Sequence, residues 1–265
     1  MKGINPLYGA IGGDLVGSIY EWRNHKSKDF ELVKSVCSFT DDSILTFATA
    51  EAVLDRPVDY VKQYYDWGGR YPHAGYGGSF QNWLMTPMED LKPYNSWGNG
   101  SAMRVSPVGF AFDTEEAVLS QAEESACATH NHPEGVKGAQ ATALAILLAR
   151  KGYDQKAIHD RIENDFGYNL SIPLDDIRPT YRFDVSCQGT VPVAIRAFLE
   201  ATSYEDAIRN AISVGGDSDT IGAITGGIAL AFFKEMPDGL VQAIESRLDM
   251  DMRRVCQRFA ERFGK

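Results

Sequence analysis

The segment SVGGDSDTIGAITGGIALAFF, residues 213–233, constrains the fold more than any other part of the chain. Its apolar second half has the length of a helix, yet small residues recur along it at Gly222, Gly226 and Gly227. Each glycine in a helix interior costs about 1 kcal/mol relative to alanine. Such a sequence is typical of a central helix whose backbone approaches a neighbour closely. The segment 135–150 predicts a second helix of this kind, through Gly138, Ala139, Ala141, Ala143 and Ala145.

Helical periodicity dominates the rest of the chain, and the alternation of half-buried strands is almost absent. Helix starts are marked at Thr114, Asp154 and Ser203. No linker, internal repeat or low-complexity tract divides the sequence. We therefore expect an all-α fold, a compact single-domain helical bundle over residues 1–265 with its functional residues in the loops between helices. The expected helices are about 6–20, 41–55, 58–67, 79–85, 101–110, 114–127, 135–150, 154–164, 190–201, 204–213, 219–234 and 237–263.

Composition excludes several functional classes. The chain has 44% apolar residues, enough for a large core, and a net charge of −10, which argues against a broad nucleic-acid surface. Its four cysteines share no CxxC spacing and are expected to be reduced thiols of a cytoplasmic protein. The N-terminal sequence lacks the pattern of a signal peptide, and no apolar run reaches the roughly 18 residues of a membrane span.

Two oxygen-rich clusters precede apolar helical segments, namely TDD within 38–54 and DSDT within 213–233. Aspartate and threonine oxygens suit Mg²⁺, Mn²⁺ or Ca²⁺ better than zinc or copper. Thr40 and Asp219 also fit helix N-caps, with Thr220 at the first helical position, so ordinary capping is the alternative interpretation. A helix N-terminus repels a cation, so a metal site there requires several carboxylates, and four are available. The candidate metal ligands are Thr40, Asp41, Asp42, Asp217, Asp219 and Thr220.

Three glycine- or histidine-containing segments are candidates for ligand binding. The turn that begins GNGSAMRVSPVGFAF (98–112) exposes backbone amides that would cradle a phosphate, or it is simply a tight helix entry. The loop 72–80 carries His73, Tyr76 and Phe80, whose rings could stack on a base or ribose, or it is a flexible surface loop. In ATHNHPEG (128–135), His130 is a candidate pocket residue or a capping histidine. The long segment 167–189 is expected to be a surface excursion near a site.

The segment 9–24 offers two more carboxylates, Asp14 and Glu21. They are seven residues apart, which would place them on one face if both lay on a single helix. A carboxylate near a metal site can serve as general acid or base. Glu21 follows an apolar run near the expected end of the helix, where it could swing. No GxSxG, P-loop or HExxH pattern is present.

Taken in order, the motifs GAIGGDLVGSIYE, FTDDS, GNGSAMRVSP, ATHNHPEG and GGDSDTIGAITGGI resemble the ADP-ribosylglycohydrolase family. The resemblance spans residues 9–230, and PHAGYGGSFQNWL is more similar to bacterial members, of the dinitrogenase reductase-activating glycohydrolase type. It implies an all-α fold around a binuclear Mg²⁺ centre, with Mn²⁺ able to substitute. The ligands it implies are the six residues of the TDD and DSDT clusters. It further implies that the 98–103 turn binds diphosphate and ribose, through Asn99, Gly100, Ser101 and Met103. Glu21 is similar to a mobile glutamate near the metals, and His130 to a histidine of the ADP-ribose pocket.

The resemblance implies a Mg²⁺-dependent hydrolase that cleaves the ribose C1″ glycosidic bond and releases ADP-ribose. Asp41 or Glu21 would then activate water or protonate the leaving group. Two alternatives stay open at this point, a metal-dependent phosphohydrolase and a non-catalytic ADP-ribose-binding module. The expected partner is an ADP-ribosylated protein or a small conjugate, with no membrane and with nucleic acid only as a modified substrate. Arginine, serine, O-acetyl-ADP-ribose and modified bases all fit as acceptors.

Overall fold

A computed structural model describes residues 4–264, and every regular element within that range is helical. The one strand-like feature there is an isolated antiparallel bridge between Gly98 and Ser186. The expected all-α fold is therefore confirmed. None of the described helices combines the length and apolarity needed to cross a membrane. The helices are α1 (Tyr8–Gly17), α2 (Asp41–Leu54), α3 (Tyr60–Arg70), α4 (Gly78–Leu84), α5 (Gly100–Met103), α6 (Ser106–Ala111), α7 (Glu115–Cys127), α8 (Pro133–Arg150), α9 (Gln155–Phe166), α10 (Leu174–Ile177), α11 (Cys187–Leu199), α12 (Tyr204–Val214), α13 (Ser218–Phe233), α14 (Asp238–Arg247) and α15 (Met250–Phe263), with a 3₁₀ turn at Met88–Asp90.

Local capping signals place most helix starts where the sequence predicts them. The side chains of Thr114, Asp154 and Ser203 each accept a hydrogen bond from a backbone N–H three residues further on, at the starts of α7, α9 and α12. Thr40 caps α2 in the same manner, through the N–H two residues on. Asp219 is not the cap of α13, because the helix begins at Ser218 and the N-cap position falls on Asp217.

Several expected helices have different bounds: α3 continues to Arg70, and α11 already begins at Cys187. The first helix ends at Gly17 rather than near residue 20. The segment 101–110 forms two short helices, because Pro107 has no N–H to donate to the carbonyl four residues earlier, and its ring crowds that carbonyl, so it is tolerated only in the first turn of α6. The segment 237–263 also divides in two, because Leu248 is extended and Asp249 caps α15 by accepting from the N–H of Met252.

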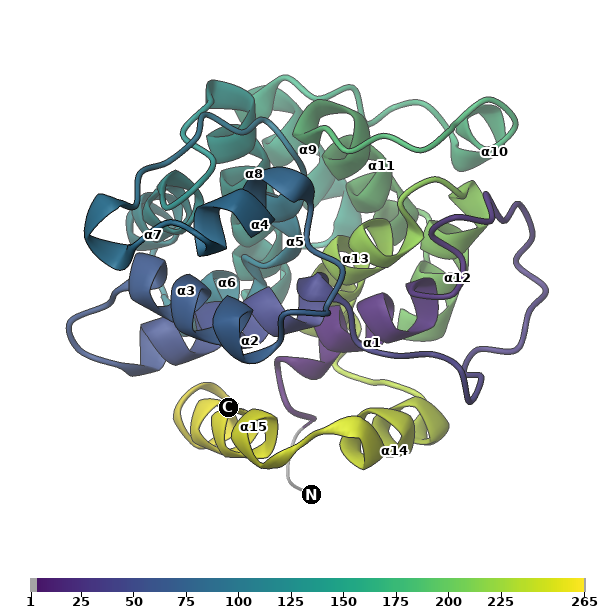
Figure 1. The fold of residues 1–265 in the computed structure, drawn as a ribbon. Helices are drawn as coiled ribbons and strands as arrows, with labels where there is room; N and C mark the ends of the chain where they lie inside the picture. Colours follow the sequence, from purple (N-terminus) through teal and green to yellow (C-terminus); the bar gives the residue numbers. More distant parts are fainter. Residues whose placement is uncertain (1–3, 265) are drawn as a thin grey trace.

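The helices α1 and α13 form the centre of the molecule and lie against each other along their length (Figure 1). A Cβ atom added at Gly13 would lie 1.9 Å from the carbonyl oxygen of Gly222, and one at Gly9 would lie 2.6 Å from that of Gly226. Only glycine permits this separation of the two backbones. The close approach expected from the small residues of 213–233 is thus confirmed, and α1 is the partner helix.

We expect Gly13→Ala to destabilise the fold by about 3 kcal/mol, because the new methyl group would displace the backbone of α13. Gly239→Ala in α14 is the matched control, since a Cβ at Gly239 meets nothing within 4 Å. That substitution is expected to stabilise the protein by about 0.5 kcal/mol through helix propensity. Urea denaturation of both variants measures the difference, and equal stabilities would contradict the packing argument.

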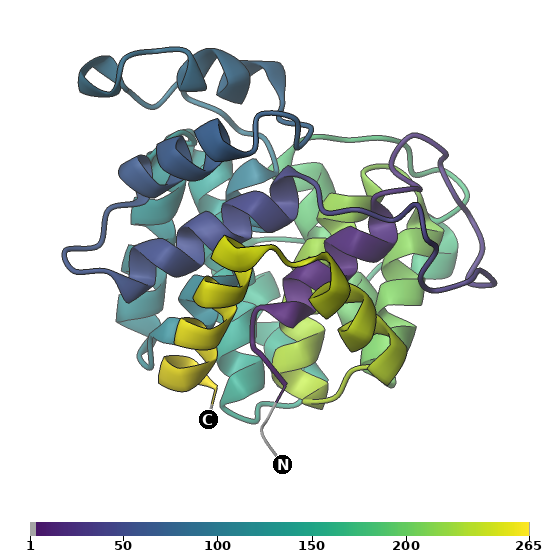
Figure 2. The same ribbon diagram turned by 60° about the horizontal axis from the view of Figure 1, so that its bottom comes forward.

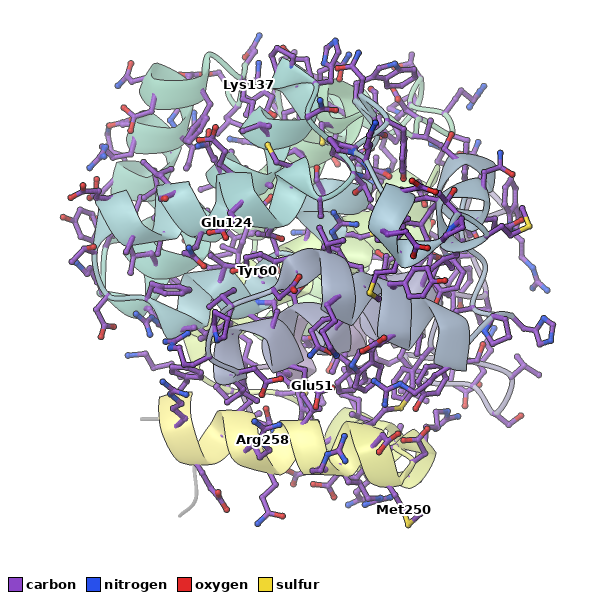
Figure 3. The ribbon with its side chains drawn as sticks, turned by 60° about the vertical axis from the view of Figure 1, so that its left-hand side comes forward. Glu51, Tyr60, Glu124, Lys137, Met250 and Arg258 are labelled. Carbon is purple, nitrogen blue, oxygen red and sulfur yellow. The ribbon has the colours of Figure 1, made fainter. Side chains whose placement is uncertain are left out.

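The C-terminal helix α15 covers α2 from outside, as Figures 2 and 3 show. Glu51 of α2 is nearly buried and accepts a hydrogen bond from Trp67 Nε1 at 2.8 Å. Arg254 and Arg258 of α15 approach the other oxygen of Glu51 at 3.5 and 3.4 Å. This charged contact joins α15 to the α2–α3 pair on the outer side of α2.

Candidate active site

The end of α1 and the starts of α2 and α13 bring the two acidic clusters together. Asp14, Asp42 and Asp219 each contribute an oxygen to a group whose members lie within 4.8 Å of one another. A second such group joins Glu21, Asp217 and Asp219. Asp219 belongs to both groups, and each group could hold a metal ion.

The packing of α1 on α13 explains how Glu21 reaches this cluster. A Cβ at Gly17 would lie 2.5 Å from the Cα of Asp219, so the end of α1 touches the backbone at the start of α13. Glu21 lies in the turns that follow α1, where the N–H of Tyr20 donates to the carbonyl of Gly17 at 2.8 Å. The prediction that Asp14 and Glu21 share one helix face is therefore wrong, because the helix ends before Glu21.

Asp14 holds the TDD turn in place. Its carboxylate is fully buried and accepts from the backbone N–H of Thr40 at 3.0 Å and of Ser43 at 3.2 Å. The hydroxyl of Thr40 donates to it at 2.7 Å, and the hydroxyl of Ser43 donates as well. Asp14 thereby satisfies N–H groups at the start of α2 that have no partner within the helix. The sequence suggested Asp14 only as an acid or base, because this contact joins residues 26 and 29 positions apart.

Two further hydrogen bonds tie neighbouring segments to the carboxylates. Asn99 donates from Nδ2 to Asp217 Oδ2 at 2.7 Å and to Thr190 Oγ1 at 3.1 Å. The hydroxyl of Thr220 donates to Asp42 Oδ2 at 3.4 Å. The 98–103 turn, α2 and α13 are thus held around one acidic centre.

Burial raises the pKa of every carboxyl in this centre. The pKa values of Asp14 and Asp217 rise to about 6, although hydrogen bonds from neighbouring groups oppose the effect of desolvation. The pKa of Glu21 rises to about 7, first through desolvation and then through the charge of Asp219, while Trp22 partly offsets the rise. The remaining carboxyls have pKa values well above the usual range, first through burial and then through neighbouring carboxylates: Asp41, Asp42 and Asp219.

Neighbouring carboxylates in this centre repel one another, and a divalent cation between them would offset that repulsion. Oδ1 of Asp42 is buried and has no hydrogen-bond partner within the described chain. The side-chain atoms proposed as metal ligands around it are carboxylate and hydroxyl oxygens, which are the ligands that hard cations prefer. A cation would also relieve the mutual repulsion that raises the pKa values. The acidic clusters are therefore able to bind metal.

We expect the metal-free protein to lose stability as the pH rises from about 4 to about 7. Across that window the folded state binds more protons than the unfolded state, because its carboxyl pKa values are raised, so the unfolding free energy falls with pH. The contribution of Glu21 to this loss levels off above its pKa, about 7. Thermal melts in EDTA measure the slope. Glu21→Gln should make the slope shallower by removing the contribution of this one carboxyl, whose pKa rises from 4.5 to about 7 on folding, and an unchanged slope in this variant would contradict the assignment.

A cavity of about 370 Å³ opens beside the carboxylates. Apart from the loop 72–80, every residue that the sequence suggested for the site lines this cavity except Asp14, Thr40 and Ser101. The hydroxyl of Thr40 is engaged by Asp14, as described above. The hydroxyl of Ser101 donates to the carbonyl of Gly135 at 2.7 Å and is fully buried. The side chain of Ser101 therefore supports the turn from behind.

The glycine-rich loop 72–80 closes one side of the cavity. Gly75 has φ +102°, and a Cβ there would lie 3.6 Å from Asp41 Oδ1. Of the three rings proposed for stacking, only Phe80 lines the cavity. Tyr76 is buried against Phe80 with ring centroids 5.1 Å apart, and His73 is exposed elsewhere.

The two histidines of 128–135 have different roles. His132 caps α8, since its Nδ1 accepts from the N–H of Glu134 at 3.1 Å. His130 is buried at the cavity wall, with the ring of Tyr94 6.0 Å away between centroids. The capping histidine of this segment is therefore His132, and His130 is the residue that lines the cavity.

Some residues of the cavity were missed by sequence reasoning. Trp22 and Phe183 stack at its wall, with centroids 4.8 Å apart and 19° between the rings. Trp22 is nevertheless 78% exposed. Phe183 comes from the segment 167–189, whose expected position near a site agrees with the structure. The pairing itself joins two loops far apart in sequence, and no local pattern marks it. Arg104 also borders the cavity, and the sequence assigned it no role there.

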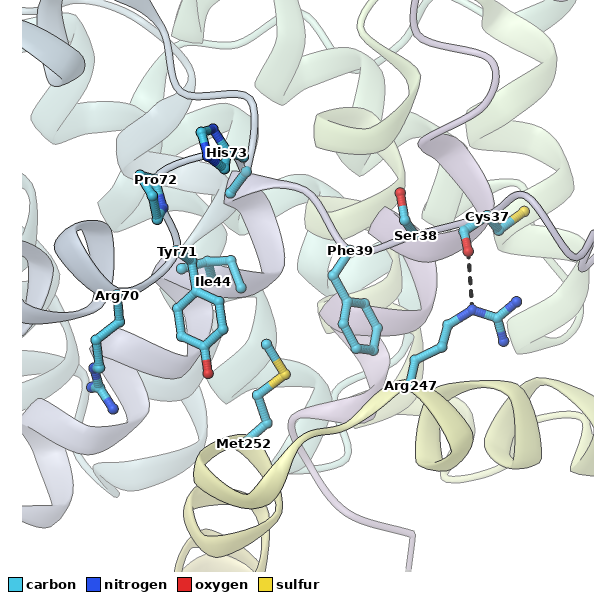
Figure 4. Close-up of a pocket in the computed structure, with 11 residues that line it drawn as sticks. Cys37, Ser38, Phe39, Ile44, Arg70, Tyr71, Pro72, His73, Arg247 and Met252 are labelled. Carbon is cyan, nitrogen blue, oxygen red and sulfur yellow. Dashed lines mark hydrogen bonds between the residues drawn. The ribbon is translucent and has the colours of Figure 1, made fainter.

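A second cavity, of about 540 Å³, lies between the start of α2, the loop after α3, and α14 and α15 (Figure 4). Phe39, Tyr71 and Met252 give it an apolar wall, and Arg247 Nε donates to the carbonyl of Cys37 at 3.0 Å. No aspartate or glutamate of the described chain lines it. The chemistry of the acidic clusters therefore belongs to the smaller cavity.

Comparison with known proteins agrees with this geometry. The family model described as ADP-ribosylglycohydrolase matches residues 4–265. ADP-ribosylhydrolase ARH3 of Homo sapiens is 27% identical over 93% of this chain and 90% of that protein, and its counterpart in Xenopus tropicalis is 25% identical over 86% of each. The ADP-ribosyl-[dinitrogen reductase] glycohydrolase of Rhodospirillum rubrum is 25% identical over 59% of this chain and 54% of that protein. A solved structure, described as an ADP-ribosylglycohydrolase-related protein complex, has the same fold, with a TM-score of 0.74, 23% identity and coverage of 97% and 96%.

Proposed function

The chain belongs to the ADP-ribosylglycohydrolase family and is a hydrolase, and on that premise we propose that it cleaves the ribose C1″ glycosidic bond of an ADP-ribose conjugate. Water would take the place of the acceptor, so the products are free ADP-ribose and the unmodified acceptor. The substrate is an ADP-ribosylated protein side chain or a small ADP-ribose conjugate. Residues 1–265 would form one such domain, in the cytoplasm, where the four free cysteines stay reduced.

One observation carries this proposal: a single cavity joins the acidic centre to a glycine turn. Gly98 and Gly100 flank Asn99, whose side chain donates to Asp217 at 2.7 Å. A diphosphate at the turn would therefore lie next to a ribose at the carboxylates. His130 borders the turn and would complete the substrate contacts, which we assign to Asn99, Gly100, Met103 and His130 at the cavity wall and to the backbone of Ser101.

We propose that two Mg²⁺ ions, or Mn²⁺ in their place, occupy the acidic centre. When bound, they would orient the ribose hydroxyls and the attacking water for a reaction that passes through an oxocarbenium-like transition state. Asp219 is the ligand shared between the two positions, in agreement with its membership of both carboxylate groups. Proton transfer is assigned to Glu21 or Asp41, both at the cavity wall. The proposed ligands are Thr40, Asp41, Asp42, Asp217, Asp219 and Thr220.

Product analysis tests the proposed function. Purified protein is incubated with Mg²⁺ and a panel of conjugates: ADP-ribosylated arginine and serine peptides, O-acetyl-ADP-ribose and ADP-ribosylated nucleic-acid bases. We expect free ADP-ribose from at least one of them, identified by chromatography and mass spectrometry. Release of inorganic phosphate or AMP would indicate a phosphohydrolase instead. Binding of ADP-ribose without turnover of any conjugate would indicate a binding module.

We expect Gly100→Val to weaken ADP-ribose binding by about tenfold or more, the equivalent of one or two lost hydrogen bonds. A Cβ at Gly100 would lie 3.2 Å from His130 Nε2, so a branched side chain would fill the space next to the turn. Gly69→Val is the control, because a Cβ there meets nothing within 4 Å. Calorimetry measures affinity and circular dichroism confirms the helices. Unchanged affinity would assign the turn a structural role only.

A further inference from the structure

A buried chain of hydrogen bonds leads from Arg104 to His130. Arg104 is fully buried, and its Nη2 donates to the carbonyl of Ser125 at 3.1 Å and to Thr129 Oγ1 at 2.8 Å. Thr129 Oγ1 in turn lies 2.7 Å from His130 Nδ1. The ring of Tyr64 covers the guanidinium, 3.9 Å from its centroid, and fixes the cation in place.

The direction of the first hydrogen bond in this chain constrains the second. A guanidinium only donates, so Thr129 Oγ1 accepts from Arg104. The threonine hydroxyl has one proton of its own to donate. The partner of this hydroxyl at 2.7 Å is His130 Nδ1, and the hydroxyl of Tyr94 also lies near enough to interact with Thr129, which opposes the rise that burial causes in the pKa of Tyr94. When the hydroxyl of Thr129 donates across the 2.7 Å contact, Nδ1 accepts and the neutral ring has its own proton on Nε2.

The surroundings of His130 keep the ring neutral. Burial, and then the charge of Arg104, hold the pKa of His130 well below its usual range. Arg104 forms no ion pair within the described chain, and its Nε and Nη1 have no hydrogen-bond partner there. A second cation beside it would be strongly disfavoured. His130 Nε2 lies over the start of α5, since a Cβ at Gly100 would be 3.2 Å from it.

We propose that Arg104 and Thr129 are positioning residues, which hold His130 as a neutral Nε2–H donor directed at an acceptor atom of the substrate beside Gly100. The assignment of a substrate to this cavity rests on the proposed function. The acceptor is a lone pair of either a phosphate oxygen or a ring nitrogen of the base, and both accept from a neutral N–H. The donor is thus set before the ligand arrives, without reorganisation of the ring.

Nitrogen NMR of the free protein tests the tautomer directly. Two-bond ¹H–¹⁵N correlation spectra, with the His130 signals identified by their loss in His130→Gln, should show a ring protonated on Nε2 alone. Thr129→Val keeps the shape of the side chain but removes the hydroxyl, so the His130 pattern should change. Thr129→Ser restores the hydroxyl and should restore the pattern. A wild-type ring protonated on Nδ1, or on both nitrogens, would overturn the proposal.

Binding and kinetics test the consequence for substrate. We expect Thr129→Val to weaken ADP-ribose binding about tenfold, as loss of one oriented hydrogen bond predicts, and Thr129→Ser to bind as the wild type does. KM should rise with kcat unchanged, because His130 contacts the turn and not the carboxylates. Thr142→Val is the matched control: Thr142 is a buried threonine whose hydroxyl has no partner, so its removal should change neither constant.

Binding of two fragments of ADP-ribose, ribose 5-phosphate and adenosine, identifies the substrate atom that accepts from His130. A loss that Thr129→Val shows for ribose 5-phosphate but not for adenosine assigns the acceptor to phosphate, and the reverse result assigns it to the base. Equal binding of ADP-ribose by wild type and Thr129→Val, with the tautomer altered, would overturn the proposed contact. The NMR and binding measurements need no turnover, so a protein that releases no ADP-ribose would refute the proposed function without affecting them.

Discussion

Replacing Asp219 with alanine is expected to abolish both metal binding and turnover. Its carboxylate is the member common to the two groups of oxygens, so its loss removes a ligand from both cation positions at once. For the same reason wild-type activity should vanish in EDTA and return with Mg²⁺ or Mn²⁺, since all the proposed ligands are oxygens. Calorimetric titration with Mn²⁺ and the rate of ADP-ribose release measure the two effects.

The fold itself should survive Asp219→Ala. In the metal-free protein this carboxyl is buried among others, and removing it relieves repulsion, so thermal stability in EDTA should not fall. Asp176→Ala, at an exposed position of α10, is the control and should keep metal affinity and rate. Full activity of the wild type in a sample verified as metal-free would refute the metal centre. So would wild-type affinity for Mn²⁺ in Asp219→Ala.

Features that depend on residues close together in the sequence, such as helix caps, were predictable from it. Thr114, Asp154 and Ser203 cap helices because a short polar side chain satisfies the first N–H groups wherever a helix begins. The glycines of 213–233 predicted a close backbone approach, and the all-α fold followed from periodicity. The partner of that approach was not predictable. Nothing near Gly222 in the sequence shows that it meets Gly13.

The parts that sequence reasoning missed depend on contacts between distant segments. Asp14 accepts from the TDD turn, and Trp22 stacks on Phe183, but neither pairing leaves a local pattern. The family motifs named the cluster residues without revealing that the hydroxyl of Ser101 is engaged by Gly135. A motif gives residue identity at each position, and the direction of each side chain is set by tertiary packing.

Glu21→Gln is expected to lower kcat by roughly 10²–10⁴-fold while metal and ADP-ribose affinities stay the same. The amide keeps the size of the side chain but removes the titrating proton. Glu21 is partly buried at the cavity wall, and its pKa of about 7 in the metal-free protein is near the value that suits proton transfer at neutral pH. A bound cation would lower this pKa, because positive charge favours the carboxylate.

The pH profile identifies which way the proton moves. A rate that rises with pH marks the Glu21 carboxylate as the base that takes a proton from water. A rate that falls marks the carboxyl as the acid that protonates the leaving group. In either case that limb of the profile should be absent from Glu21→Gln. Glu31→Gln is the matched control, because Glu31 is exposed in the same connection between α1 and α2. A near-full rate in Glu21→Gln, with its metal retained, would transfer the proton-transfer role to Asp41, the other carboxylate proposed for it at the cavity wall.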